Sequence, residues 1–480
     1  MKIHNVRAGF ATNSSSSHSI VMLAPGTSER DDEYSRFEYG WEQFTLSDAD
    51  SKTAYLAVQL RQALESQNIP THTAVQLVNS WLGTSYDEPQ LEAGYVDHQS
   101  AWSLLQGPLG QNPEFVQEFH AWLLKQDVVI LGGNDNSDGQ TPPAHSYENN
   151  LTQLVHTHGD NIRVRKDGAY WVLFDAARTG NKIRFSFDDQ APSYVKSATP
   201  ELVDIKLSNW CGYGCEFCYQ GSTKQGAHAD WLHVNSVLES LADLGVFEVA
   251  FGGGEPTHYP HFAQAIRRAA ELGITPNFTT FGVDWLQNVD LVQAVQAHVS
   301  AIGVSVQTSK DLNKVRKIDQ ALNQNKGWDD RKVHVTPQHV VGSVHMGELS
   351  TLMETSWVEG FDMLLLGYKH TGFGAQFTPH DCEGLDTLLR LQMDRTHKPR
   401  WGAKFRSLGV DTAFVQNFES VLQDLQIPHV LITNAEGAFS WYVDCVTQSQ
   451  GPSSYMPEHM VPFVEGELMP QIAQSFTSWK

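Results

Sequence analysis

The stretch NWCGYGCEFCYQGS, residues 209–222, places three of the chain's five cysteines on one short segment. They are Cys211, Cys215 and Cys218. Thiolates at this CxxxCxxC spacing can hold a metal centre. A structural zinc site needs four ligands, and His228 could supply the fourth. An iron–sulfur cluster held by three cysteines instead leaves one iron without a protein ligand, open to a substrate or a second cofactor.

The segments around the cysteines alternate between β-rich and helical runs from Glu201 onward. The expected strands are LVDIKLS, FEVAFGGG, ITPNFTT, AIGVSVQT, KVHVTPQHVV and FDMLLLG. Helix-patterned runs lie between them, including VNSVLESLADLG, FAQAIRRAAELG, DLVQAVQAHV and LNKVRKIDQALNQ. This alternation predicts an α/β fold, a partial (β/α)6 TIM-like barrel with a parallel sheet inside helices. Sites in such folds lie at the C-terminal ends of strands, and the cysteines directly follow the first strand.

A linker, DDQAPSYVKSATP, interrupts the periodic pattern near residue 190 and divides the chain. We expect an N-terminal α+β domain over 1–190, the barrel over 200–380 and a C-terminal extension over 381–480. In the first domain, runs from Ala54 and Phe115 have helical spacing, and IRVRKDGAYWVLFD and KIRFSF read as strands. In the extension, WYVDCVTQSQGPSSY alternates around a polar turn and predicts a hairpin that caps the open side of the barrel.

The barrel segment resembles the radical S-adenosylmethionine (SAM) superfamily, whose signature is CxxxCxΦC with an aromatic residue before the last cysteine. Phe217 fills that position. A second motif, FGGGEPT, ends the expected second strand, where the family's GGE motif contacts the amino group of SAM. The resemblance gives that role to Gly253, Gly254 and Glu255. Glycine permits close backbone approach to a ligand, and a carboxylate suits an ammonium group.

The later strands resemble the family more loosely. Ser305 and Gln307, in GVSVQTS, occupy the fourth strand, where relatives often place a polar side chain against the SAM ribose. The sixth strand ends in LLLGYKHTGFG, where Tyr368 and Lys369 are placed for contact with a substrate. Packing and a solvated charge are the alternative readings of these two residues. The third strand ends FTTFG, where many relatives have an asparagine–glycine pair.

The resemblance implies a [4Fe–4S] cluster and SAM as cofactors, with reductive cleavage of SAM to a 5′-deoxyadenosyl radical that abstracts hydrogen from a substrate. It also implies a low-potential electron donor such as flavodoxin. The substrate is expected to be a peptide, a protein or a small metabolite. A nucleotide-modifying enzyme of the same superfamily and a non-catalytic, zinc-binding interaction protein are the alternatives. After Cys218 only Cys382 and Cys445 remain, too few for the auxiliary clusters of a SPASM domain.

The composition restricts the location and the partners of the chain. Its 33 Lys+Arg against 55 Asp+Glu give a net charge of -22, which disfavours bulk nucleic-acid binding. No apolar run approaches the roughly 18 residues of a membrane span, and the N-terminus lacks the apolar region of a secretory signal. Few cysteines also argue against a secreted disulfide framework. We therefore expect a cytoplasmic protein without membrane partners.

Three motifs outside the barrel have no assigned chemistry. NSSSSHS, residues 13–19, is either a flexible entry to a strand or a recognition segment. GGNDNSDG, residues 132–139, lacks the glutamate of a calcium loop and reads as a turn. His156 and His158 lack a metal-ligand pattern. Because every cofactor motif lies after Glu201, we expect the first domain to take part in substrate recognition.

Overall fold

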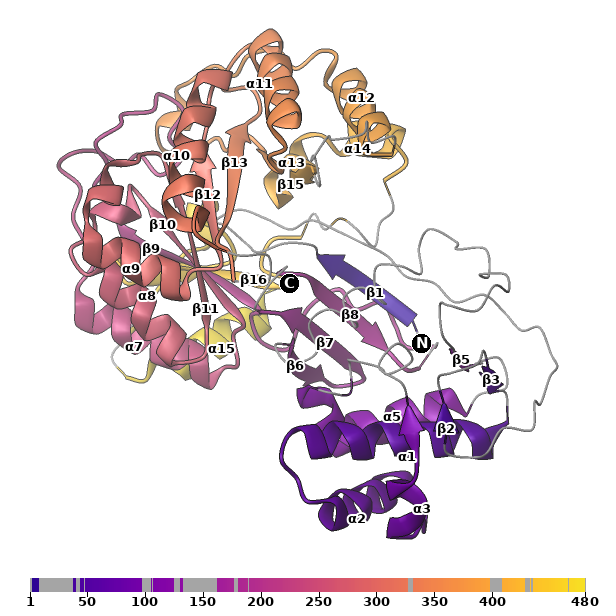
Figure 1. Ribbon diagram of the computed structural model, residues 1–480. Coiled ribbons are helices and arrows are strands. Elements are labelled where there is room, and N and C mark those ends of the chain that lie inside the picture. Colours follow the sequence, from indigo (N-terminus) through magenta and orange to yellow (C-terminus); the bar gives the residue numbers. More distant parts are fainter. Residues whose placement is uncertain are drawn as a thin grey trace. The chain divides into compact units, whose positions relative to one another are not determined.

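The structure is a computed structural model in which two compact units are distinguished (Figure 1). The first holds Met1–His4, Ser19–Ala177 and Ile183–Ser193, and the second holds Asn5–His18, Arg178–Lys182 and Tyr194–Lys480. The described residues are 2–7, 38–39, 44–46, 48–96, 105, 107–124, 130–132, 162–176, 180–188, 190–326, 331–397, 408–427, 432, 435–464 and 466–479. The serine-rich segment 13–19, residues 133–139, His156 and His158 lie outside them.

The first unit combines helices with a small sheet. Its helices are α1 (Ala49–Ser66), α2 (Thr71–Leu82), α3 (Glu88–Glu92) and α5 (Pro113–Leu123). A four-stranded sheet has the order β1 (Lys2–Arg7), β8 (Lys182–Ser186), β7 (Tyr170–Asp175) and β6 (Ile162–Asp167). Two short pairs join β2 (Glu38–Tyr39) to β4 (Tyr95–Val96) and β3 (Phe44–Leu46) to β5 (Ile130–Gly132). Helix α2 is an element that the sequence pattern did not identify.

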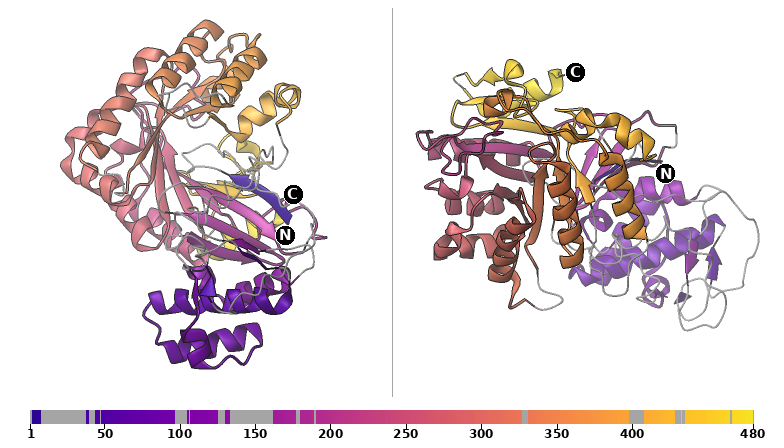
Figure 2. Two further views of the ribbon diagram at one scale, coloured as in Figure 1. Left: turned by 45° about the vertical axis from the view of Figure 1, so that its right-hand side comes forward. Right: turned by 90° about the horizontal axis from the view of Figure 1, so that it is seen from above.

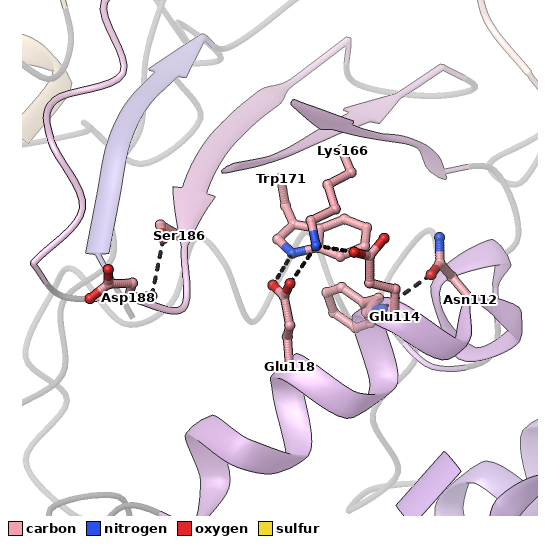
Figure 3. A network of polar contacts seen from close by, with 8 residues as sticks. Asn112, Glu114, Glu118, Lys166, Trp171, Ser186 and Asp188 are labelled. Atoms are coloured by element: carbon pink, nitrogen blue, oxygen red, sulfur yellow. Dashed lines mark hydrogen bonds and ion pairs between the residues drawn. The ribbon is translucent and has the colours of Figure 1, made fainter. Parts of the chain in front are cut away.

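Helix α5 is tied to the β6–β7 hairpin by a polar network around Lys166 (Figure 3). Lys166 Nζ forms ion pairs with the carboxylates of Glu114 and Glu118 and lies over the ring of Trp171. Trp171 Nε1 donates a hydrogen bond of 2.8 Å to Glu118 Oε2. The helix begins where Asn112 Oδ1 accepts from the Phe115 backbone N–H at 3.1 Å. One carboxylate, Glu118, therefore satisfies both a cation and a buried indole.

The second unit is built on one ten-stranded sheet (Figures 1 and 2). Its central strands are β9 (Leu202–Ser208), β10 (Glu248–Gly253), β11 (Thr275–Thr280), β12 (Ala301–Ser305), β13 (His334–Val340), β14 (Met363–Leu366) and β15 (Leu408–Val410). These seven follow one another in sequence order and pair in parallel. β16 (Ser440–Asp444) pairs in parallel with the other edge of β9, and β17 (Ser449–Gly451) and β18 (Val461–Pro462) continue antiparallel.

Helices cover the outer side of this sheet (Figures 1 and 2). They are α7 (Trp231–Asp243), α8 (Phe262–Glu271), α9 (Val289–His298), α10 (Leu312–Asn323), α11 (Met346–Glu359), α12 (Leu385–His397), α13 (Thr412–Asn417), α14 (Glu419–Asp424) and α15 (Leu468–Ser478). Among the described residues no helix combines the length and apolar character needed to cross a membrane.

The two faces of the sheet differ in polarity because successive side chains of a strand point to opposite faces. The helix-facing residues form one apolar core, which includes Val203, Ile205, Leu207, Val249, Phe251, Phe278, Ile302, Val304, Met363, Leu365, Trp441 and Val443. The alternate positions form the inner face and are largely polar, as in Asp204, Lys206, Ser208, Asn277, Thr279, Ser305, Thr336, Gln338, Tyr442 and Asp444. The apolar core between sheet and helices stabilises the barrel, and the inner face carries the polar side chains that can bind ligands.

The expected partial barrel is confirmed, and all six predicted strands form in the predicted order. The sequence pattern did not identify helix α11, strand β15 or the parallel pairing of β16 with β9. The expected hairpin forms as β16 and β17, paired from Tyr442 with Gly451 to Asp444 with Ser449. It extends the sheet beyond β9, so the C-terminal segment supplies inner-face residues.

We predict that Glu118→Ala destabilises the protein by about 1–3 kcal/mol, because the buried indole N–H of Trp171 loses its acceptor. Glu114→Ala is the matched control, since it removes the other ion pair with Lys166 and leaves the indole hydrogen bond in place. Glu114 is 61% exposed, and its ion pair should contribute only about 0–1 kcal/mol. Urea denaturation followed by circular dichroism measures both. Equal losses in the two variants would contradict this role of Glu118.

Candidate functional site

The C-terminal ends of the parallel strands bring the candidate site residues of the barrel to one edge of the sheet. The cysteine loop follows β9, the Gly253–Gly254–Glu255 turn ends β10, and Phe281 follows β11. Ser305 ends β12, and Lys369 follows β14.

The glycines of the β10 turn hold the cysteine loop by its backbone. Gly254 N–H donates to Ser208 O at 2.7 Å, and Glu255 N–H donates to Trp210 O at 2.9 Å. A Cβ at Gly253 would lie 2.4 Å from Ser208 O, and one at Gly254 would lie 2.0 Å from Trp210 O. Gly253 also has φ +117°, which side-chain-bearing residues rarely adopt. Only glycine lets the two strand ends approach this closely.

The segment after β14 holds the other side of the cysteine loop. Phe373 N–H donates to Cys218 O at 2.9 Å, and Thr371 Oγ1 donates to Tyr219 O at 3.1 Å. A Cβ at Gly372 would lie 2.5 Å from Tyr219 O. The ring of Phe217, the aromatic residue of the signature, packs edge-on against Phe377 with centroids 5.9 Å apart.

The end of the third strand packs on the cysteine loop through Tyr213. The rings of Tyr213 and Phe281 lie 4.7 Å apart, and Tyr213 Oη donates to Asp284 Oδ2 at 3.3 Å. A Cβ at Gly282 would lie 1.7 Å from Tyr213 Oη. The departure FTTFG from the usual asparagine–glycine pair is thus a packing surface for this loop.

The carboxylate of Glu255 is buried, with 1% of the residue exposed, and is held by its neighbours. Its Oε1 accepts a hydrogen bond from Thr280 Oγ1 at 2.8 Å. The same oxygen accepts two from Thr257, from Oγ1 at 2.7 Å and from the backbone N–H at 3.3 Å. Its Oε2 accepts from Phe281 N–H at 2.9 Å. Burial raises the pKa of Glu255, and these hydrogen bonds oppose the increase. Glu255 thereby links the end of β10 to the end of β11.

The three thiols influence one another electrostatically. Burial raises the pKa of Cys215 to about 11, the charges of Cys218 and Cys211 add to the increase, and the Lys314 ammonium opposes it. Burial likewise raises the pKa of Cys211, with Glu255 and Cys218 adding to it. Ionising these thiols together is therefore unfavourable unless a cationic centre binds them.

The histidine considered as a zinc ligand has its contacts elsewhere. His228 Nδ1 lies 2.9 Å from Ser208 Oγ, and its ring lies 6.0 Å from the Tyr259 ring. Within the described part of the chain, no group of three or more His, Cys, Asp or Glu side chains is placed to hold a metal ion. The remaining cysteines lie apart from the loop, since Cys445 is buried in the apolar core and Cys382 Sγ contacts His380 O.

Ser305 and Gln307 differ in position. Ser305 is the last residue of β12 and lies half-buried on the inner face. Gln307 lies beyond the strand, because the chain turns where Asp311 Oδ2 accepts hydrogen bonds from the backbone N–H groups of Gln307 and Thr308, both at 3.0 Å. The expected strand over GVSVQTS is therefore shorter than its sequence pattern indicates.

Tyr368 and Lys369 make different contacts. Tyr368 is buried, and its Oη donates to Gly374 O at 2.7 Å, so it fixes the loop after β14. Lys369 Nζ lies 3.8 Å from Asp411 Oδ2 and between the rings of Tyr219 and Tyr455, at 4.6 and 4.9 Å from their centroids.

Sequence reasoning missed the acidic residues near Lys369. They are Asp204, Asp411 and Glu436, and each interacts electrostatically with Lys369. The one available signal was the alternation of the strand LVDIKLS, which places Asp204 on the same face as Lys206 and Ser208.

Residues 205–332 match the family model of the radical SAM superfamily. The PqqA peptide cyclase of Rhodopseudomonas palustris is 30% identical over 113 residues, which are 23% of this chain and 30% of that protein. The GTP 3′,8-cyclase of Chlorobaculum tepidum is 30% identical over 113 residues, 23% of this chain and 34% of that protein. The chain spans less than half the length of the curated relatives it matches.

Solved structures similar to the chain include Streptococcus suis SuiB bound to precursor peptide SuiA, with 14% identity and a TM-score of 0.46 over 80% of this chain and 85% of that one. Another is anSMEcpe with bound AdoMet and a Cp18Cys peptide, with 15% identity and a TM-score of 0.41 over 58% of this chain and 81% of that one.

We predict that Gly254→Ala destabilises the protein by about 1–3 kcal/mol and exposes the cysteine loop, because the added Cβ overlaps the Trp210 backbone. Urea denaturation gives the first quantity, and alkylation of Cys211 followed by mass spectrometry gives the second. The control is Gly347→Ala, where no atom lies within 4 Å of the added Cβ and helix α11 should tolerate alanine. Wild-type stability and alkylation in Gly254→Ala would show that the turn does not hold the loop.

Proposed function

Because residues 205–332 form a radical SAM domain, we propose that the chain reductively cleaves SAM and abstracts hydrogen from a substrate. In the proposal Cys211, Cys215 and Cys218 hold a [4Fe–4S] cluster. The observation that carries it is the pair of backbone hydrogen bonds from Gly254 and Glu255 to Ser208 O and Trp210 O, which ties the GGE motif to the chain that leads into the CxxxCxΦC motif. When bound, the cluster and SAM supply the electron transfer and the 5′-deoxyadenosyl radical.

The three cysteines fit a cluster by the chemistry of their thiols and by their spacing on one loop, whereas their side chains in this structure are not gathered as they would be around a metal ion. Burial and neighbouring thiolate charge raise the pKa of Cys211 and of Cys215, and the irons of a cluster would offset that cost of ionisation. Glu255 N–H donates to Trp210 O, just before the loop, and Phe373 N–H donates to Cys218 O, so the backbone of the cysteines is positioned without the cluster. Phe217 is proposed to shield the site from water on the side of Phe377.

We assign SAM to the adjacent strand ends. A carboxylate oxygen accepts up to two hydrogen bonds, and Glu255 Oε2 accepts one from Phe281 among the described residues. It is therefore able to accept another from the SAM ammonium. The backbone of Gly253 and Gly254 is the adjoining surface, and Ser305, at the end of β12, is proposed to contact the ribose. Gln307 is proposed as a second polar contact from the turn that follows.

The proposed substrate is a peptide or a small molecule. The names of the relatives, a peptide cyclase and a GTP cyclase, support both a peptide and a nucleotide reading. The net charge of -22 favours a peptide over a nucleotide, because it repels phosphate groups. We propose that a low-potential protein such as flavodoxin donates the electron for SAM cleavage, and that the chain works in the reducing cytosol. The first unit is proposed to take part in substrate recognition, which hydrogen exchange in the presence of the isolated substrate would test.

A zinc-binding interaction protein is the alternative function. It would need a fourth ligand, and the contacts of His228 are with Ser208 and Tyr259. Stoichiometric zinc without iron after anaerobic purification would favour that alternative.

We predict that Cys218→Ala loses the cluster and SAM cleavage, because three thiolates are needed to hold it. Cys382→Ala is the control, since Cys382 lies outside the cysteine loop. Iron and sulfide analysis measures the cluster, and chromatography of 5′-deoxyadenosine measures cleavage. Full iron content and full product formation in Cys218→Ala would make the ligand assignment wrong.

We predict that Glu255→Gln weakens SAM binding by about one to two decades, because an ionic hydrogen bond worth about 1.5–3 kcal/mol is lost. Glutamine keeps an acceptor for Phe281 N–H and removes the charge. Glu271→Gln, at the exposed end of α8, is the control. Anaerobic titration calorimetry measures SAM affinity, and unchanged affinity in Glu255→Gln would remove this side chain from the SAM site.

A further inference from the structure

The inner face of the barrel beside the cysteine loop contains an imbalance of charge. Lys369 interacts electrostatically with three carboxylates, which belong to Asp204 on β9, Asp411 after β15 and Glu436 before β16. The nearby cation Lys206 is already paired, since its Nζ lies 3.2 Å from Asp444 Oδ2. The cluster thus has two more acidic than basic side chains.

Lys369 is fixed on the side of Asp411. Asp411 Oδ1 accepts hydrogen bonds from the backbone N–H groups of Gly367 and Phe414, both at 2.7 Å, and its Oδ2 faces Lys369 Nζ at 3.8 Å. The side chains of Lys369 and Asp411 are 9% and 3% exposed. Backbone donors therefore hold Asp411 against Lys369. The carboxylates of Asp204 and Glu436 have no cation of their own in this cluster.

Asp204 and Glu436 are the carboxylates in excess. Glu436 Oε1 accepts a hydrogen bond of 2.7 Å from Tyr455 Oη. Asp204 Oδ1 is buried and has no hydrogen-bond partner among the described residues. Burial raises the pKa of Asp204 to about 7, with Lys369 opposing, and burial also raises the pKa of Glu436. A buried carboxylate without a donor costs free energy unless a partner arrives.

This imbalance lies next to the proposed radical chemistry. Tyr219, whose ring contacts Lys369, directly follows Cys218, and its carbonyl is held by Thr371. Aromatic faces such as that of Tyr455 attract organic cations. A ligand anion would instead meet Asp204 and Glu436, because Lys369 is already engaged by Asp411.

We propose that Asp204 and Glu436, beside the Lys369–Asp411 ion pair, form a substrate site that binds a primary ammonium or guanidinium group. The inference rests on the proposed function and adds the chemical class of its substrate. The group can belong to a lysine or arginine side chain of a peptide or to a free amine.

The test uses the full chain with its cluster and SAM in anaerobic titration calorimetry. The probes are N-acetyl-lysine methylamide, N-acetyl-arginine methylamide, n-butylamine and the neutral N-acetyl-norleucine methylamide. We expect at least one cationic probe to bind about tenfold or more tightly than the norleucine derivative, as a charge-assisted hydrogen bond requires. Binding of butylamine comparable to that of the amino-acid derivatives assigns the site to free amines, and tighter binding of the derivatives assigns it to a peptide.

Two isosteric variants locate the site. Asp204→Asn and Glu436→Gln should each reduce the preference for the cationic probe about tenfold, and Glu348→Gln, exposed on α11, should not. If one variant fails to fold, the other variant and the comparison of cationic with neutral probes on the wild-type chain still test the inference. Equal binding of the cationic and neutral probes, or an unchanged preference in the folded variants, overturns the inference. A wild-type chain without iron or SAM cleavage instead contradicts the proposed function.

Discussion

The close contact between the β10 turn and the backbone that leads into the cysteine loop is the constraint on which the site depends. Gly254 and Glu255 donate to the carbonyls of Ser208 and Trp210, at distances that leave no room for a side chain on Gly254. Two loops that follow neighbouring parallel strands thus become one rigid unit. As a consequence, the backbone that leads into the cysteine loop and the turn that carries Glu255 have a fixed relation before any cofactor binds.

The two-faced sheet explains where the chemistry lies. Its outer face is apolar and packed by helices, so burial of that face stabilises the barrel. Its inner face collects polar and charged side chains that contribute little to an apolar core, among them Asp204 and Gln338. Retaining such residues costs stability unless they pair or bind something. The pairing of Lys206 with Asp444 shows that β16 completes this face from the end of the chain.

Local patterns were sufficient to predict the strands from β9 to β14 and the places of the cysteine loop and the GGE turn, because those features depend on short periodicities and on motifs at strand ends. They were insufficient where distant segments meet. Strand β15 has three residues, which carry too little pattern to identify. The acidic neighbours of Lys369 come from β9, from the residue after β15 and from the segment before β16, and the sequence does not show that these meet.

The roles of single residues could likewise be predicted where they depend on local sequence, and could not where they depend on contacts with distant segments. The close approach expected for Gly253 and Gly254 is present, but the backbone they approach is that of the chain itself. Gln307 lies past the strand because Asp311, four residues later, caps the turn. For Tyr368 the sequence leaves substrate contact and packing open, and the structure shows that its hydroxyl donates to Gly374 O.

The most direct measurement is made on the full chain, purified and reconstituted with iron and sulfide without oxygen, reduced with dithionite and supplied with SAM. The account predicts about four iron per chain and the formation of methionine and 5′-deoxyadenosine in equal amounts. A chain that binds stoichiometric zinc without iron, or that carries the cluster and leaves SAM intact, would contradict it.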